Sequence, residues 1–185
     1  MKNLKFKTLV GLYGLIVFSC LIQSCCEEFL TITETGGIYA WDLYEGSDGY
    51  IERQSTTTIT GEFILGVYFQ YSFSSLNNVS LVSSSYATSC KETLTNAIDK
   101  STLGLSLNKS FVLNGDSIPA HANLLGIENS GVVLNTVLDR GVEFKFTESF
   151  FSNATLENGD CIIKFNGRTD DNVQLESELE VEVVL

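Results

Sequence analysis

The stretch that decides the fold of this chain is residues 63–73, FILGVYFQYSF. Apolar side chains occupy every odd position of the stretch, whereas the even positions become more polar toward its end. Because successive side chains of a β-strand point to opposite faces, this period of two predicts a strand with one apolar face. A helix would spread the same side chains around its circumference.

The same period recurs along the chain. Residues 175–185, LESELEVEVVL, alternate apolar and acidic side chains, and residues 142–147, 161–165 and 103–107 alternate as well. Between the runs stand residues that tolerate a positive φ and so favour turns: Asp48-Gly49, Asn114-Gly115-Asp116, Asn158-Gly159-Asp160 and Asn166-Gly167.

The expected fold is therefore all-β. An antiparallel β-sandwich, immunoglobulin-like in form, would bury one face of each of two sheets, and a barrel is the alternative. At most one short helix is expected, around residues 91–100 after Ser89 as a cap. The core would draw on Phe63, Phe69, Phe73, Phe144, Phe146, Ile163 and Phe165.

The first 24 residues differ from the rest. Lys2, Lys5 and Lys7 precede a mostly apolar run over residues 9–22, which is the pattern of a secretory signal peptide. The alternative, a retained membrane helix, is disfavoured because about 20 apolar residues are needed to cross a bilayer. In addition, Glu27 and Glu28 stand where a basic stop would be expected.

The end of this run, LIQSC at residues 21–25, resembles a bacterial lipobox. The resemblance implies that the Cys25 sulfur receives a diacylglycerol, that cleavage occurs just before Cys25, and that the new amino group is acylated, for example with palmitate. Cys20 lies inside the apolar run and Cys26 follows another cysteine, so both are weaker candidates.

The segment also resembles the start of Bacteroidota surface lipoproteins. In these proteins acidic residues soon after the lipidated cysteine direct export to the cell surface, which implies this role for Glu27 and Glu28. An ordinary solvated linker is the alternative. The expected organisation is a signal peptide (1–24), a lipidated N-terminus and tether (25–36), and a single β-sandwich domain (37–185).

Four further segments resemble an uncharacterised family of Bacteroidota lipoproteins. They are SCC at 24–26, SSYATSC at 84–90, NGDSIPAHANLL at 114–125 and FNGRTDD at 165–171. That family carries no known activity, so the resemblance implies location and lineage only.

Charge excludes one class of partner. The net charge of the 185 residues is −12, and loss of residues 1–24, which hold three lysines and no acid, would lower it to −15. Such a chain repels nucleic acid, which proteins bind by neutralising phosphates with Lys and Arg. Anionic lipid headgroups repel it too, so its membrane attachment would depend on the acyl chains.

Two covalent modifications are expected in the folded region. Export to an oxidising compartment permits a disulfide, and Cys90–Cys161 is the preferred pair, with Cys26 left over. The segment Asp116-Ser117-Ile118 resembles the Asp-Ser/Thr-aliphatic acceptor that Bacteroidota glycosylate, which implies O-glycosylation at Ser117.

Candidates for catalysis or metal binding are weak, so we expect no enzyme activity, metal or cofactor. His121 is the single histidine, and Asp116 and Ser117 lie in the same loop, whereas catalytic triads are assembled from separate elements. The cysteines lack the C-x-x-C spacing of a zinc site. Two acidic clusters offer oxygen ligands for calcium, although solvated turns are the favoured interpretation: Asp170, Asp171 and Asn172, and Asp42, Glu45 and Asp48.

An aromatic group at residues 39–50 leaves two functions open. Tyr39, Trp41, Tyr44 and Tyr50 would either stack on a sugar ring or cover the end of the sandwich. The leading hypothesis is a non-enzymatic structural or interaction module, lipid-anchored at the outer membrane and exposed at the cell surface, with the periplasmic face as the alternative. The second hypothesis is an accessory glycan-binding lipoprotein of a nutrient-capture system. The partner, protein or glycan, is not specified by the sequence.

Overall fold

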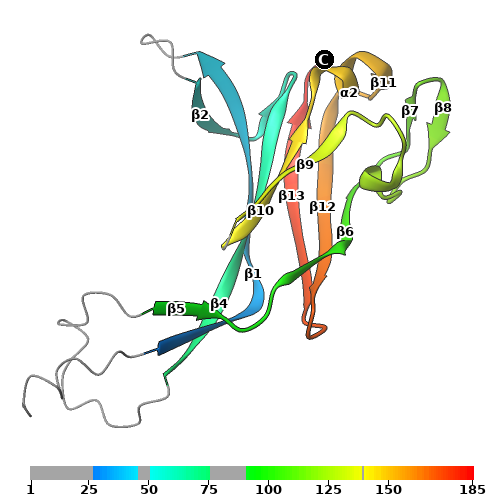
Figure 1. Ribbon diagram of the computed structural model, residues 1–185. Coiled ribbons are helices and arrows are strands. Elements are labelled where there is room, and N and C mark those ends of the chain that lie inside the picture. The colour runs from blue at the N-terminus through cyan, green and yellow to red at the C-terminus, as the bar shows by residue number, and fades with distance from the viewer. Residues whose placement is uncertain (1–26, 46–50, 76–90, 139) are drawn as a thin grey trace, which may run out of the picture. The chain divides into compact units, whose positions relative to one another are not determined.

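The computed structural model describes residues 27–45, 51–75, 91–138 and 140–185 (Figure 1). The predicted signal peptide, Cys25, Cys26, Asp48-Gly49, Tyr50 and Cys90 lie outside these residues. The chain divides into two compact units, residues 1–30 with 73–93 and residues 31–72 with 94–185. The second unit holds the core and the candidate site.

The described strands form three sheets. The first sheet has the order β2 (Ile51–Thr56), β1 (Glu27–Glu45), β4 (Phe63–Ser75), β10 (Gly141–Phe146) and β9 (Val132–Leu138). The second has the order β3 (Thr58–Ile59), β13 (Gln174–Val183), β12 (Gly159–Thr169) and β6 (Ile98–Leu107). A small third sheet joins β11 (Ala154–Thr155), β7 (Phe111–Leu113) and β8 (Asp116–Ile118).

The remaining elements are short. β5 (Lys91–Leu94) pairs with β1. The helix α2 (Glu148–Asn153) follows β10, and the 3₁₀ turn η2 (Leu124–Gly126) precedes β9. Pairing between the long strands is antiparallel, whereas the two-residue β3 runs parallel to β13.

The core lies where the inner faces of the first and second sheets meet. Phe63 of β4 stacks on Phe146 of β10 with ring centroids 4.4 Å apart, and Phe144 of β10 meets Phe165 of β12 at 6.0 Å. Each of these side chains is at most 2% exposed, and burial of a phenylalanine stabilises a fold by about 1.5–3 kcal/mol. The all-β class with packed antiparallel sheets is therefore confirmed.

The alternating runs predicted these strands well. The run 142–147 falls in β10 except for Thr147, the run 161–165 falls in β12, and residues 175–185 fall almost entirely in β13. Of the seven expected core residues, all but Phe73 are buried. Phe73 is 67% exposed, because β10 pairs with β4 only from Phe63 to Tyr68 and the apolar alternation continues beyond that pairing.

Other local expectations were wrong. The helix expected at 91–100 is strand β5 followed by the start of β6, and the helix that does form, α2, lies at 148–153. Asn166-Gly167 is not a turn but lies within β12, where the register to β6 shifts between Asn166 and Arg168. The segment expected as a tether is strand from Glu27 onward, and its Ile32 is 2% exposed.

Two asparagine side chains replace missing strand partners. Asn96, 3% exposed, accepts a hydrogen bond from Ile32 N–H (2.8 Å) and donates to Ile32 O (3.1 Å). Asn123 accepts from Leu105 N–H of β6 (3.1 Å) and donates to Leu103 O (3.4 Å). Both residues therefore satisfy buried backbone groups that would otherwise be unpaired.

Candidate functional site

Three aromatic rings gather on the outer face of the first sheet. Tyr39 and Trp41 belong to β1 and Tyr68 belongs to β4. The alternation of each strand directs them away from the core, into which Ala40 and Val67 point. The ring centroids of Tyr39 and Trp41 lie 6.4 Å apart with 27° between the planes, and Tyr68 meets them edge-on at 5.9 and 6.0 Å. We call these three residues the aromatic face.

Much of the aromatic face is open to solvent. Tyr39 is 48% exposed and Tyr68 is 38% exposed, while Trp41 is partly buried. Leu138 of β9, 45% exposed, lies in the same cross-strand row as Tyr68 with β10 between them, because Gly141 pairs with both Tyr68 and Leu138. Contiguous exposed apolar patches often mark contact surfaces, so the aromatic face is a candidate for one.

A glycine allows the indole of Trp41 to approach the backbone of β4 closely. A Cβ atom at Gly66 would lie 2.3 Å from Cη2 and Cζ3 of Trp41. Any other residue at this position of β4 would push the ring away. Gly66 therefore determines the position of Trp41, as glycines often do where another group approaches the backbone closely.

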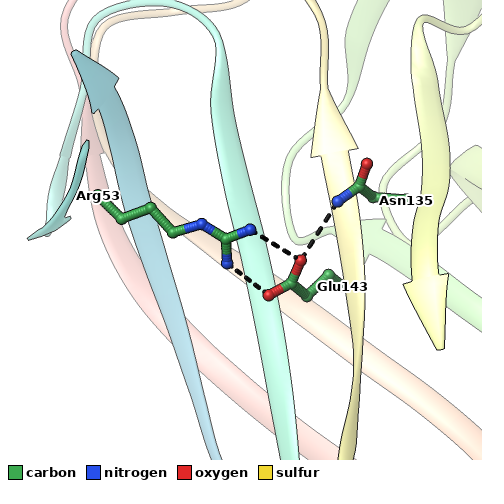
Figure 2. Close-up of polar contacts among 3 residues, drawn as sticks. All are labelled: Arg53, Asn135 and Glu143. Carbon is green, nitrogen blue, oxygen red and sulfur yellow. Dashed lines mark hydrogen bonds and ion pairs between the residues drawn. The ribbon is translucent and has the colours of Figure 1, made fainter. Parts of the chain in front are cut away.

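A network of charged and polar side chains, drawn in Figure 2, lies next to the aromatic face. The guanidinium of Arg53 on β2 donates from Nη1 to Glu143 Oε1 (2.5 Å) and from Nη2 to Oε2 (3.2 Å). Asn135 of β9 donates to the same Oε2 at 3.2 Å. The side chain of Glu143 is only 7% exposed, whereas that of Arg53 is 44% exposed.

This network also reaches the indole. The guanidinium carbon of Arg53 lies 5.8 Å from the centre of the Trp41 ring, within the range of a cation–π contact. The hydrogen bond to Glu143 raises the pKa of Arg53 further above its usual value. The network of Arg53, Glu143 and Asn135 joins three strands, since β2, β10 and β9 each supply one of these residues.

The predicted aromatic group is thus only partly the one observed. Tyr39 and Trp41 lie together, whereas the side chain of Tyr44 and the whole of Tyr50 lie outside what the structure describes. Tyr68, Arg53, Asn135 and Glu143 were missed. The one available signal was the pair Gly66 and Tyr68 on the polar side of residues 63–73, but strand order, which brings these residues to β1, has no local signal.

The predicted modification and export sites are placed only in part. Glu27 and Glu28 begin β1, and their side chains are not described. Ser117 is exposed on β8, in a hairpin whose turn has positive φ at Asn114 and Gly115. Cys161 is buried, which raises the pKa of its thiol, and its Sγ lies 3.5 Å from Asn108 Oδ1. The Cys90–Cys161 disulfide stays a prediction because Cys90 lies outside the described residues.

The segment that contains Asp116, Ser117 and His121 spans β8 and the loop that follows it. His121 is exposed with φ of 65°, and its backbone N–H donates to Leu107 O at 2.8 Å. Asp116 and Ser117 lie on β8 with exposed side chains. Among the described contacts, no hydrogen bond joins these three side chains.

The acidic clusters likewise serve the fold. Asp171 accepts hydrogen bonds from Thr169 Oγ1 and from Asn96 Nδ2, and these bonds lower the pKa of its carboxyl. Asp170 Oδ1 accepts from Ala97 N–H at 3.2 Å. In the other cluster only Asp42 has a described side chain, and burial raises its pKa. No group of acids, His or Cys suited to a metal ion occurs within the described ranges.

A polar hollow of about 410 Å³ lies on the second sheet, away from the aromatic rings. Its polar groups are largely occupied with one another: Gln174 donates to Glu176 at 2.6 Å, and Thr102 Oγ1 accepts from Arg168 N–H at 2.8 Å. The lining residues are Thr102, Asn166, Gly167, Arg168, Gln174 and Glu176. The aromatic face, with its open rings, is the stronger candidate site.

No model of a known protein family, no curated protein and no solved structure matches this chain. In the part of the chain that the structure describes, no helix has the length and hydrophobicity that a membrane crossing requires.

Proposed function

We propose that this protein is a lipid-anchored, non-enzymatic interaction module of a Bacteroidota outer membrane, displayed at the cell surface. The anchor would be a diacylglycerol and a further acyl chain, such as palmitate, at Cys25. The residues that support this proposal are the lipobox at 21–25 and the acidic pair Glu27 and Glu28.

The observation that carries the interaction role is the aromatic face. Three rings are held in fixed relation, two of them more than one-third exposed, on a rigid sheet. The carboxylate beside them, Glu143, has both oxygens engaged by Arg53 and Asn135. A carboxylate with every oxygen engaged and little exposure suits positioning of neighbouring groups better than proton transfer.

The second candidate function is accessory glycan binding within a nutrient-capture system. Aromatic side chains on a preformed surface, with hydrogen-bonding groups beside them, are the usual means of holding a ligand that is apolar on one side and polar at its edge. The ring cluster of Tyr39, Trp41 and Tyr68 favours this function over a purely structural one.

Lipidation is tested by growing cells that express the full chain with tritiated palmitate. The wild-type protein and a Cys26→Ser control should carry the label, and Cys25→Ser should lose it. Wild-type protein without label, or Cys25→Ser with label, would refute the anchor.

Surface display is tested by treating intact cells with protease. The wild-type protein should be cleaved, whereas a Glu27→Ala/Glu28→Ala variant should be labelled by palmitate but protected. Equal cleavage of both proteins would remove the role of the acidic pair, and protection of both would place the protein on the periplasmic face.

A further inference from the structure

We propose that the aromatic face binds the pyranose ring of a neutral glycan, with Tyr39 and Trp41 as the stacking platform. This inference rests on the proposed function, because it names the ligand class of the same interaction module. Four observations lead to it: the geometry of the rings, the hydrogen-bonding groups beside them, the local charge balance, and the small size of the surface.

The ring geometry suits a sugar. Tyr39 and Trp41 stand two residues apart on β1, so both side chains leave the same face of the strand, and their rings are stacked with centroids 6.4 Å apart and 27° between their planes. Two neighbouring rings of similar tilt form a shallow apolar floor on which the C–H side of a pyranose packs. Tyr68, edge-on to both rings, forms a border from which its hydroxyl group can bond to a sugar hydroxyl.

The polar groups beside the floor complete the site. A guanidinium has five N–H donors. Arg53 directs one N–H of Nη1 and one N–H of Nη2 at Glu143. With 44% of its side chain exposed, Arg53 has donors left for ligand oxygens. In its cation–π contact the guanidinium lies over the Trp41 ring, with its carbon 5.8 Å from the ring centre, so its donors are held next to the apolar surface that the rings offer.

Charge balance selects a neutral ligand. The positive charge of Arg53 is matched by a bidentate contact with Glu143, and on the same strand Lys145 is matched by Glu62 at 2.8 Å. A chain with a net charge of −12 would repel uronic acids or sulfated sugars, with no unmatched cation at this site to attract them. Sugar hydroxyls need donors and acceptors but no net charge.

The small area favours a glycan over a protein partner. An aromatic side chain can bury about 150–250 Å², so rings of partial exposure offer roughly 200–300 Å² in total. A stable protein interface buries about 800 Å² on each partner. A surface of this size matches one or two sugar units.

The structure provides its own reporter for the test, because Trp41 is the only tryptophan in the chain. The full-length lipoprotein in detergent is titrated with neutral polysaccharides (amylopectin, laminarin, xyloglucan and galactomannan) and with acidic ones (alginate and polygalacturonate). The expected result is a shift in tryptophan emission, and slower migration in affinity gels, with at least one neutral polysaccharide and with neither acidic one.

Variants assign the binding to the aromatic face. Tyr39→Ala should weaken binding at least tenfold, measured by emission, and Trp41→Ala should abolish slower migration in the gel. Phe73→Ala removes an exposed ring that belongs to the first compact unit and should bind as the wild type does. Circular dichroism of each variant confirms folding, and if Trp41→Ala does not fold, Tyr39→Ala alone decides.

Three outcomes would overturn the proposal: no neutral polysaccharide changes the emission, an acidic one binds instead, or Tyr39→Ala binds as tightly as the wild type. A fourth is self-association through this face, seen as a dimer that Tyr39→Ala converts to a monomer without glycan binding. Failure of the anchor is distinguishable, since it would appear as missing palmitate label with glycan binding intact.

Discussion

Replacing Asn96 by alanine should destabilise the protein more than the loss of a single polar side chain usually does. The amide of Asn96 is the partner of both backbone groups of Ile32, at 2.8 and 3.1 Å, and Ile32 is 2% exposed. Without the amide, a buried N–H and a buried C=O are left unpaired, and each costs about 1–3 kcal/mol. We therefore expect the free energy of unfolding to fall by about 2–5 kcal/mol.

Urea denaturation followed by the emission of Trp41 and by circular dichroism measures this change. The matched control is Asn153→Ala, whose exposed side chain makes no described hydrogen bond, and it should change the free energy of unfolding by less than about 0.5 kcal/mol. A loss below about 1 kcal/mol for Asn96→Ala, similar to the control, would refute the reasoning.

An aspartate at the same position sharpens the test. Asn96→Asp keeps an acceptor for Ile32 N–H but places a carboxylate next to that of Asp171, which now accepts from the amide at 3.1 Å. We expect repulsion at pH 7 that is relieved at acidic pH or by a second change, Asp171→Asn. Additive effects of the two substitutions would contradict the contact.

Three further predictions concern other parts of the second unit. Gly66→Ala should displace the indole of Trp41, shift its emission and lower the free energy of unfolding by about 1–3 kcal/mol, whereas Gly61→Ala, with open space around it, should do neither. The pKa of Asp171 is lowered in the fold by its hydrogen bonds, so its contribution is present above the unfolded value of about 3.9 and lost as pH falls through the folded value; in urea melts from pH 7 to pH 2, Asp171→Asn should lose less stability than the wild type. The Cys161 thiol is buried and has a raised pKa, so after prior reduction, which opens the predicted Cys90–Cys161 bridge, it should react with iodoacetamide only after unfolding; rapid alkylation of the Cys161 peptide in folded, reduced protein, measured by mass, would contradict its burial.

The strand pattern could be predicted because it is local. The odd positions of residues 63–69 are all apolar and are buried as expected, since one face of the strand meets the core, although Ile64 and Gly66 on the other face are buried as well. The helix expected at 91–100 failed because its Asn96 side chain binds the backbone of Ile32, a contact 64 residues away. Tertiary partners of this kind override local propensity.

The candidate site was predictable only in its first strand. Tyr39 and Trp41 lie two residues apart, so their shared face follows from the period of two. Tyr68, Arg53 and Glu143 reach them through the order β2-β1-β4-β10, in which β4 and β10 are neighbours although some 70 residues separate them in sequence. The register of such pairs is set by the whole fold, and therefore no short segment encodes it.

The amide of Asn123 covers part of the free edge of β6, and this bears on the tendency of the protein to aggregate. A bare strand rim is a template on which further chains can grow into amyloid-like fibrils. Asn123 is hydrogen-bonded to Leu105 N–H and Leu103 O, so these two backbone groups are not free to pair with a strand of another molecule. At high concentration, we therefore expect β6 of one molecule not to pair with a strand of another at Leu103 and Leu105.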